Sequence, residues 1–534
     1  MIDFATQQQQ INKINKQLKR YRLGIETILS VTAIAITCGV LLKVILDIDN
    51  NYDPGWYHLP FAARLGGILS QEMFTGDEKW FEPRFDGFPL LAHTLQGFFW
   101  RITGRIQSTN LVSFFAITGY FCFLKIWFKV PLYLSAIALF SIPLVLTHAS
   151  TSFVDLLGNV GTSILVMMSY RFYKNRQLPT TKDLIIALIG AAIAANTKTQ
   201  LQPLVFVILL VAGARLGWLY WQQQPQIKPQ LPKLAIALLA AIVIFATPVK
   251  NTVLHGNPLY PIKIQIGSIV LNHKLSPEAY ETGNRQQNWI ASVLEINAPF
   301  RWTPDQWSTD IERNRRGGFF GLYVVFNLLL LSGMLLREVV QNKYLLIDKQ
   351  NPNRLATPTQ NTHEVRVAVV TVIAMSIVPL NFPQSHELRY FMYWMITLVS
   401  LNLYLVSLPK NKELLGRWLT PKYMGLIYLI FLIVVQIRTD AFYIKPSGIT
   451  LDKYVSFGVK QEYLYQIKPN ERVCLISKHI GEDVQGAPIA ALKYAFLYSS
   501  YFHPEIDHDY SIQAALDPSA CGDRTIIPSD FDSP

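Results

Sequence analysis

The sequence predicts an all-α polytopic membrane protein of about 11 transmembrane helices, with juxtamembrane helices on the outer face and a small C-terminal extracytoplasmic α/β tail. Composition is the first observation behind this fold class: 51% of the 534 residues are hydrophobic, only 16% are charged, and the mean hydropathy is +0.23. The second is that apolar runs of about 20 residues, enough to cross a hydrocarbon core, recur along the chain. Such runs must be helical, because lipid offers no partner for free backbone polar groups.

The first apolar run, about residues 23–46, follows a Gln-rich and basic segment, residues 1–22. The run is too long for a signal-peptide core and shows no clear cleavage site, so we interpret it as an uncleaved anchor. Residues 88–103 are apolar but short, and we expect an interfacial helix on the outer face. The later runs that we expect to span the membrane are 107–124, 131–147, 154–172, 183–197, 199–221, 234–253, 318–337, 366–382, 389–408 and 421–438.

If these runs all span the membrane, the connections between them alternate between its inner and outer sides. The distribution of positive charge agrees with this alternation. Each expected inner connection is basic, and the first carries Lys125 and Lys129. The positive-inside rule then places the N-terminus in the cytoplasm and the tail outside the plasma (inner) membrane. The expected divisions are a cytoplasmic N-terminus (1–22), a transmembrane domain (23–438) with outer loops at 47–106 and 255–317, and an extracytoplasmic C-terminal domain (439–534).

The net charge of +12 would indicate nucleic acid in a soluble protein, but here the Lys and Arg residues lie between apolar runs, where topology explains them. The absence of a Walker-type or HExxH sequence argues against an ATP-driven pump or a zinc protease. Among the four cysteines, Cys474 and Cys521 share the tail and could pair in an oxidising compartment. The tail also contains a strand-like run, residues 472–476.

An acidic cluster follows the first span directly. Asp47, Asp49 and Asp53 stand there together with Tyr57 and His58. The simplest interpretation is a solvated loop without chemistry. We nevertheless expect this cluster to belong to a functional site, because charged residues elsewhere in the chain are expected on the same side of the membrane.

These other residues stand at the outer ends of spans. Asp155 begins one span, Lys198 lies in a turn between two, and Arg389 begins a late one. If the helices bundle, they would meet Asp53 and, with Arg84, form a pocket of fixed positive charge. Arg and Lys bind phosphate oxygens, so such a pocket suits a phosphate-bearing lipid. The carboxylate would deprotonate an acceptor hydroxyl while the cations stabilise the departing phosphate.

Simpler roles remain open for the same residues. Lys198 can be a snorkelling turn residue, Arg389 an interfacial anchor paired with Glu387, and Asp155 the cap of its own helix.

Six features, in order along residues 23–408, resemble the GT-C superfamily of polyprenyl-phosphate-sugar-dependent glycosyltransferases, near its protein O-mannosyltransferase and aminoarabinose-transferase branch. The features are Asp53-xxx-Tyr57, Pro89-Leu90 with Gly97 to Gly104, His148 to Asp155, Thr197-Lys198, Gly256-Asn257-Pro-Leu-Tyr260-Pro261 and Arg389-Tyr390. The resemblance implies a GT-C-like helical fold and Asp53 as the catalytic base, and Asp49 is the rival for that role. It also implies inverting transfer of a sugar from an outer-leaflet polyprenyl-phosphate donor to an extracytoplasmic glycan, lipid or protein.

The candidate substrate-binding residues are Tyr57, His58, Arg84, His93, Asp155, Lys198, Asn257, Tyr260, Arg389 and Tyr390. Hydrogen-bonded structural histidines and interfacial belt tyrosines are the alternatives. The sequence departs from the family pattern at Pro54, where the family has Glu, and at Phe88, where it has a second Pro. Asp47 and Asp49 imitate the Asp-x-Asp metal motif of the oligosaccharyltransferase branch, but the remaining pattern favours the metal-free branch, so we expect no metal or other cofactor.

Two other classes of function compete with the enzyme. A lipid or solute transporter, or a flippase, would use the same polar pocket, but it predicts polar residues at the midplane and interrupted helices. A structural scaffold gives no reason for the positions of Lys198 and Arg389. The expected partners are the sugar donor, an extracytoplasmic acceptor and membrane lipid, without nucleic acid.

Overall fold

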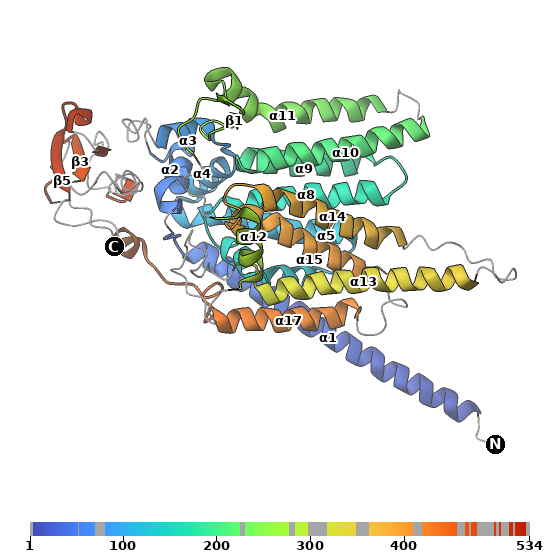
Figure 1. The fold of residues 1–534 in the computed structure, drawn as a ribbon. Helices are drawn as coiled ribbons and strands as arrows, with labels where there is room; N and C mark the ends of the chain where they lie inside the picture. Colours follow the sequence, from blue (N-terminus) through green and yellow to red (C-terminus); the bar gives the residue numbers. More distant parts are fainter. Residues whose placement is uncertain are drawn as a thin grey trace.

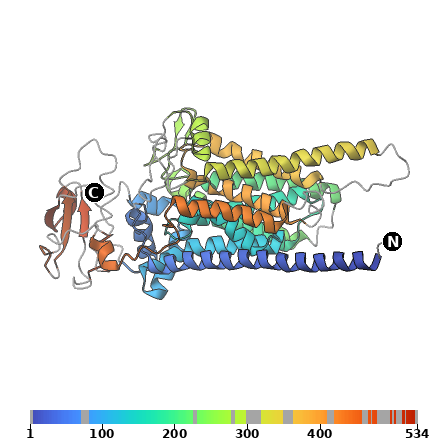
Figure 2. The same cartoon turned by 90° about the horizontal axis from the view of Figure 1, so that it is seen from below.

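The computed structural model describes residues 4–51, 53–69, 81–224, 230–276, 283–296, 318–348, 362–408, 419–456, 465–468, 471–477, 496–497, 501–503, 512–515 and 518–529. The chain folds as a bundle of long helices that run side by side (Figures 1 and 2). Short helices and the strands of the tail gather at one end of this bundle, which we call the tail end, and the N-terminus lies at the other. The prediction of a mostly helical, multi-pass membrane protein is confirmed.

Within these ranges, eight helices are long and apolar enough to cross a membrane. They are α1 (Phe4–Leu46), α5 (Leu111–Phe128) with the preceding η3 (Ile106–Asn110), α10 (Leu201–Gln223), α11 (Leu231–His255), α13 (Gly321–Asp348), α14 (Thr362–Asn381), α15 (Met392–Ser407) with the preceding η6 (Leu388–Phe391), and α17 (Pro421–Arg438). Helix α1 is continuous from residue 4, so no helix end marks the expected boundary at residue 22.

The other three expected spans are less regular. Residues 131–147 divide into α6 (Leu132–Phe140) and α7 (Pro143–His148), because Pro143 starts a new helix. Helix α8 (Asp155–Lys174) carries many polar residues and is almost wholly buried, so protein rather than lipid covers it. It packs against α9 (Thr181–Thr197) at a close approach where a Cβ on Gly161 would lie 2.8 Å from the Gly190 carbonyl oxygen. That these segments span the membrane stays a prediction.

The described residues after α1 form short helices at the tail end. They are η1 (Pro54–His58), α2 (Leu59–Leu65), α3 (Phe81–Gly87) and α4 (Leu91–Thr103). The expected helix at 88–103 is therefore present as α4, whose exposed Phe98 and Ile102 suit a membrane surface. Helices α2 and α4 touch backbone to backbone, since a Cβ on Gly97 would lie 2.3 Å from the Ala62 carbonyl oxygen.

The second outer loop and the tail add small elements to the same end. The loop contains a hairpin of β1 (Gln265–Ile266) and β2 (Ile269–Val270), then α12 (Arg285–Leu294). The tail contains α18 (Leu451–Ser456), β3 (Val473–Ser477), β4 (Ile512–Ala515), η8 (Pro518–Cys521) and β5 (Thr525–Ser529).

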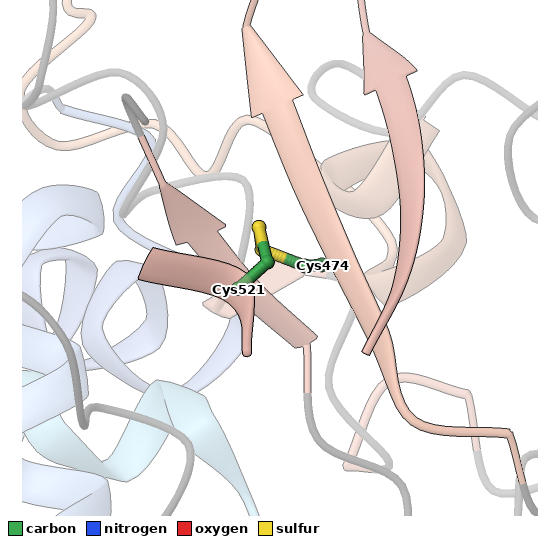
Figure 3. Close-up of a disulfide and its surroundings, with 2 residues drawn as sticks. All are labelled: Cys474 and Cys521. Atoms are coloured by element: carbon green, nitrogen blue, oxygen red, sulfur yellow. A yellow bond between two sulfur atoms is a disulfide. The ribbon is translucent and has the colours of Figure 1, made fainter. Parts of the chain in front are cut away.

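Strand β3 confirms the strand expected at 472–476 and pairs in parallel with both neighbours, in the order β4-β3-β5. Cys474 on β3 and Cys521 before β5 form a disulfide (Figure 3). The tail rests on the short helices, where Trp100 of α4 lies edge-on to the ring of Tyr501, with centroids 4.9 Å apart. Apolar packing thus attaches the tail to the membrane domain.

Candidate functional site

Two ion pairs lie next to each other at the tail end of the bundle. Asp53, at the start of η1, pairs with Arg389 of η6. Asp155, the first residue of α8, pairs with Lys198, where the extended backbone separates α9 from α10. The exposed fractions of these side chains are 19% for Asp53, 12% for Arg389, 1% for Asp155 and 11% for Lys198. Four charges from distant parts of the sequence are thus largely removed from water.

Tyr390 connects the two pairs. The Lys198 ammonium lies 4.1 Å from the centroid of the Tyr390 ring, and the Arg389 guanidinium lies 5.1 Å from it. Cations at such distances are attracted by the negative face of an aromatic ring. The ring of one tyrosine therefore lies close to both cations.

Asn159 of α8 fixes Arg389 relative to Asp155. Its amide donates to the Arg389 carbonyl oxygen (3.0 Å), and its side-chain oxygen accepts from the Tyr393 backbone N–H (2.9 Å). The bond to Tyr393 is buried and the bond to Arg389 is partly buried, and an unpaired backbone group is costly in such a place. The two bonds therefore hold α8 and the start of α15 in register. Asn159 was not predicted as a site residue, although a polar residue one turn after Asp155 in an apolar run could have indicated it.

Two stacked histidines lie beside the ion pairs. Nδ1 of His58 and Nε2 of His93 are 2.8 Å apart, and the ring centroids are 5.1 Å apart. Burial, with a smaller effect of Lys198, lowers the pKa of His93 to about 3. Burial and the neighbouring His93 lower the pKa of His58 well below its usual value. Both imidazoles are therefore neutral at pH 7 and add no positive charge.

Tyr57 lies between the histidines and Asp53. Its ring centroid is 4.0 Å from that of His58, and burial followed by the charge of Asp53 raises its pKa well above the usual value. The phenol thus keeps its proton and can donate a hydrogen bond. Phe153 closes this side, with its ring 5.9 Å from that of His58 and 5.9 Å from the Arg389 guanidinium carbon.

Several buried polar atoms of this group have no hydrogen-bond partner among the described residues: Oδ2 of Asp155, Nε2 of His58 and Nδ1 of His93. Buried polar atoms are nearly always paired in folded proteins, and each unpaired one deserves an explanation. The Asp155 oxygen is an acceptor. Of the two imidazole nitrogens, one is a donor and the other an acceptor, because the histidines are bonded to each other through their other nitrogens. A bound molecule can use all three atoms.

The two carboxylates of the Asp-x-Asp sequence have structural contacts instead. Asp47 pairs with Lys43 (2.7 Å) and accepts from the backbone N–H of Ser447 (2.9 Å). Asp49 accepts from the backbone N–H of Ser152 (2.8 Å). These bonds hold the end of α1 against two other parts of the chain. The alternative of Asp49 as the base and the expectation of a metal-free site both stay predictions.

The remaining candidates lie in supporting positions. The Arg84 guanidinium carbon lies 4.7 Å from the centroid of the Trp56 ring, next to Tyr57. Asn257 is buried and its amide bridges the carbonyl oxygens of two loop residues, while the Tyr260 ring stacks on His255 at 3.8 Å. These contacts shape the second outer loop, and none of them joins Asn257 or Tyr260 to the two ion pairs within the described chain.

The assembled group combines two carboxylates, two fixed cations, a protonated phenol and two neutral imidazoles. This set can bind an oxyanion and can take a proton from a neighbouring hydroxyl. Comparison of the chain with family models, with curated proteins and with solved structures gave no match.

Proposed function

We propose that the protein is an inverting glycosyltransferase that moves a sugar from an outer-leaflet polyprenyl-phosphate donor to an extracytoplasmic acceptor. The observation that supports this proposal most is the adjacency of two acid–base pairs, Asp53 with Arg389 and Asp155 with Lys198, around Tyr390. The resemblance to the GT-C superfamily supports the same reaction, because it assigns Asp53 as the base.

The donor phosphate binds by exchanging partners. Its oxygens accept from the Arg389 guanidinium, whose planar fork fits phosphate, and from the Lys198 ammonium. In the free protein both cations are bonded to carboxylates. Binding therefore releases the Asp53 carboxylate from Arg389, so that its lone pairs become available only when the donor is present.

The chemistry is then a single displacement. Asp53 takes the proton of the acceptor hydroxyl, and the hydroxyl oxygen attacks the anomeric carbon. The bond from that carbon to the phosphate oxygen breaks, its electron pair leaves with the phosphate, and Arg389 and Lys198 stabilise the new charge. The products are the glycosylated acceptor and the polyprenyl phosphate, and one in-line displacement inverts the anomeric configuration. No general acid is needed, since phosphate is already a good leaving group.

The neutral state of His58 and His93 fits this reaction. Two neutral imidazoles can hydrogen-bond a sugar without competing with Arg389 and Lys198 for the phosphate. The Tyr57 phenol, which keeps its proton, can donate to the same sugar.

The test compares membranes that contain the wild-type protein, Asp53→Asn or the control Asp452→Asn. Asp452 is an exposed carboxylate on α18, so the control removes an equal charge away from the site. The prenyl-linked sugar pool is labelled, and the loss of label from prenyl lipid is followed with time. We expect Asp53→Asn to lower the transfer rate by roughly a hundredfold or more, with Asp452→Asn unchanged. Undiminished transfer by Asp53→Asn would remove Asp53 from the role of base.

Two observations favour a transporter as the second candidate. Helices α6 and α7 are interrupted inside the bundle, and a buried polar group lies between long helices, where Asn402 and Tyr428 both donate to the side-chain oxygen of Asn327 (3.0 and 3.1 Å). A transporter predicts that purified protein moves labelled prenyl lipid between the leaflets of a vesicle, whereas the enzyme predicts no such movement.

A further inference from the structure

A cavity lined by two arginines lies between the ends of α8, α10 and α14. These helix ends point away from the tail (Figure 1). Its volume is about 380 Å³, within the range of small-molecule sites in proteins. Its polar and aromatic lining consists of Tyr173, Arg176, Arg215, Trp218, Gln222 and His363. Among its described lining residues none is acidic, so the cavity carries net positive charge.

Arg215 is held in place at this cavity by the end of α8. Its guanidinium donates to the carbonyl oxygens of Phe172 (3.3 Å), Tyr173 (3.5 Å) and Asn175 (3.0 Å), which the helix leaves without internal partners. The guanidinium carbon also lies 5.6 Å from the centroid of the Tyr173 ring. A fixed cation at this position is preorganised for an anion, because little side-chain freedom is lost on binding.

Arg176 and His363 complete the polar wall of the cavity. Gln223 donates to the Arg176 carbonyl oxygen (2.6 Å), and His363 contacts the Tyr173 carbonyl oxygen (3.3 Å). The Arg176 guanidinium itself makes no hydrogen bond or ion pair with the described part of the chain. Glu364, the neighbour of His363, is paired with Lys174 at 3.5 Å, so its negative charge is offset there.

Two tryptophans on α10 indicate the level of the cavity relative to the membrane. Trp218 is 49% exposed and Trp221 is 66% exposed, and both lie in the last turns of an apolar helix. Exposed tryptophans in such a position mark the level of lipid headgroups. Basic pockets between membrane helices at this level are suited to anionic headgroups.

We propose that this cavity binds the phosphate group of an anionic phospholipid headgroup. Arg176 and Arg215 hold the phosphate oxygens, and Trp218 lies against the glycerol and the start of the acyl chains. The site is separate from the two ion pairs at the tail end, so it does not depend on the proposed transferase activity.

The test uses full-length protein in a neutral detergent and native mass spectrometry, with phosphatidylglycerol, phosphatidylcholine, glycerol 3-phosphate and inorganic phosphate as probes. Arg176→Gln removes one positive charge from the lining and leaves the hydrogen bonds of Arg215 to the end of α8 intact. Lys182→Gln is the matched control, because Lys182 is an exposed cation at the same end of the bundle and does not line the cavity. His363→Ala is a second variant that also leaves the hydrogen bonds of Arg215 intact.

We expect phosphatidylglycerol to bind the wild-type protein and Lys182→Gln equally, and to bind Arg176→Gln about fivefold more weakly. His363→Ala should also bind it more weakly, and phosphatidylcholine should bind no variant comparably. If glycerol 3-phosphate or inorganic phosphate binds as tightly as the lipid, the source is a free phosphate and the lipid assignment is wrong. Equal binding of phosphatidylglycerol to all four proteins would overturn the site itself.

Discussion

Asp53 and Arg389 are 336 residues apart in the sequence and form an ion pair at the tail end of the helix bundle. Their pairing joins the segment after the first span to the start of α15, and the adjacent pair of Asp155 and Lys198 adds the start of α8. Both pairs are largely withdrawn from water, and Arg389 has a second carboxylate partner in Glu387, whose Oε2 lies 3.5 Å from its Nε. The four residues therefore hold distant segments of the chain together at one place in the fold.

Tyr57→Phe should slow sugar transfer by roughly tenfold, because it removes one hydrogen bond that burial keeps available as a donor. The control is Tyr465→Phe, at a tyrosine that is 85% exposed. Transfer is measured in membranes by loss of label from the prenyl donor. Equal rates for the two variants would show that the Tyr57 phenol makes no contact in the transition state.

Gly97→Ala should disturb the short helices at the tail end. A Cβ at residue 97 would lie 2.3 Å from the Ala62 carbonyl oxygen, and backbone cannot yield as a flexible side chain can. We expect a loss of about 1–3 kcal/mol, seen as a lower Tm in detergent. Gly119→Ala is the matched control, since nothing lies within 4 Å of its added Cβ inside α5, and it should leave Tm equal or higher. A Tm unchanged by Gly97→Ala would mean that α2 and α4 separate freely.

His93 should make the protein less stable in mild acid. Its pKa is about 3 in the folded protein and about 6.5 in the unfolded chain. Above pH 6.5 both states are neutral and its contribution to stability is complete. Below pH 6.5 the unfolded chain binds a proton that the folded protein refuses until about pH 3, so stability falls by about 1.4 kcal/mol per pH unit.

The measurement is Tm in detergent at pH 7 and pH 5. The wild-type protein should have the lower Tm at pH 5, and His93→Gln should reduce the difference between the two pH values. His273→Gln, in the second outer loop, should keep the wild-type difference. An unchanged difference in His93→Gln would show that other groups cause the acid sensitivity.

The disulfide of the tail can be tested by alkylation in denaturing detergent, where burial no longer protects thiols. Cys38 and Cys122 are free and provide the internal control. We expect two alkylated cysteines before reduction and four afterwards, because Cys474 and Cys521 are joined. Four alkylated cysteines without reductant would refute the pairing.

The long apolar runs predicted the bundle because each is one membrane thickness long, and the short run before Gly104 predicted α4. The break between α6 and α7 was harder to see, since Pro143 lies inside a continuous apolar run. Charge at helix ends indicated Asp155, Lys198 and Arg389, but not which carboxylate each cation binds. Sequence proximity even favoured Glu387 for Arg389, whereas the structure adds Asp53 from the far end of the chain.

The backbone partners of buried polar residues were not predictable from one sequence. Asn159 holds α15 through a carbonyl oxygen and a backbone N–H, which no local pattern reveals. Asn257 and Tyr260 lie in a turn that resembles one of the GT-C superfamily, and the Asn257 amide and the Tyr260 ring contact residues of the same loop. A polar residue in a loop looks the same in sequence whether it bonds a ligand or its own backbone.

The proposed function requires Arg389 and Lys198 to bind the phosphate of a prenyl-linked sugar donor. The most direct measurement is mass spectrometry of the lipids that co-purify with the wild-type protein, Arg389→Ala, Lys198→Ala and the control Lys250→Ala, which removes a partly exposed cation on α11 that pairs with Asp86. Arg389→Lys, which keeps the charge, is added in case Arg389→Ala does not fold. We expect a polyprenyl phosphate or its sugar derivative on the wild-type protein and on Lys250→Ala, and roughly tenfold less on the Arg389 and Lys198 variants. Equal amounts on all variants, or no prenyl lipid on the wild-type protein, would contradict the proposed function.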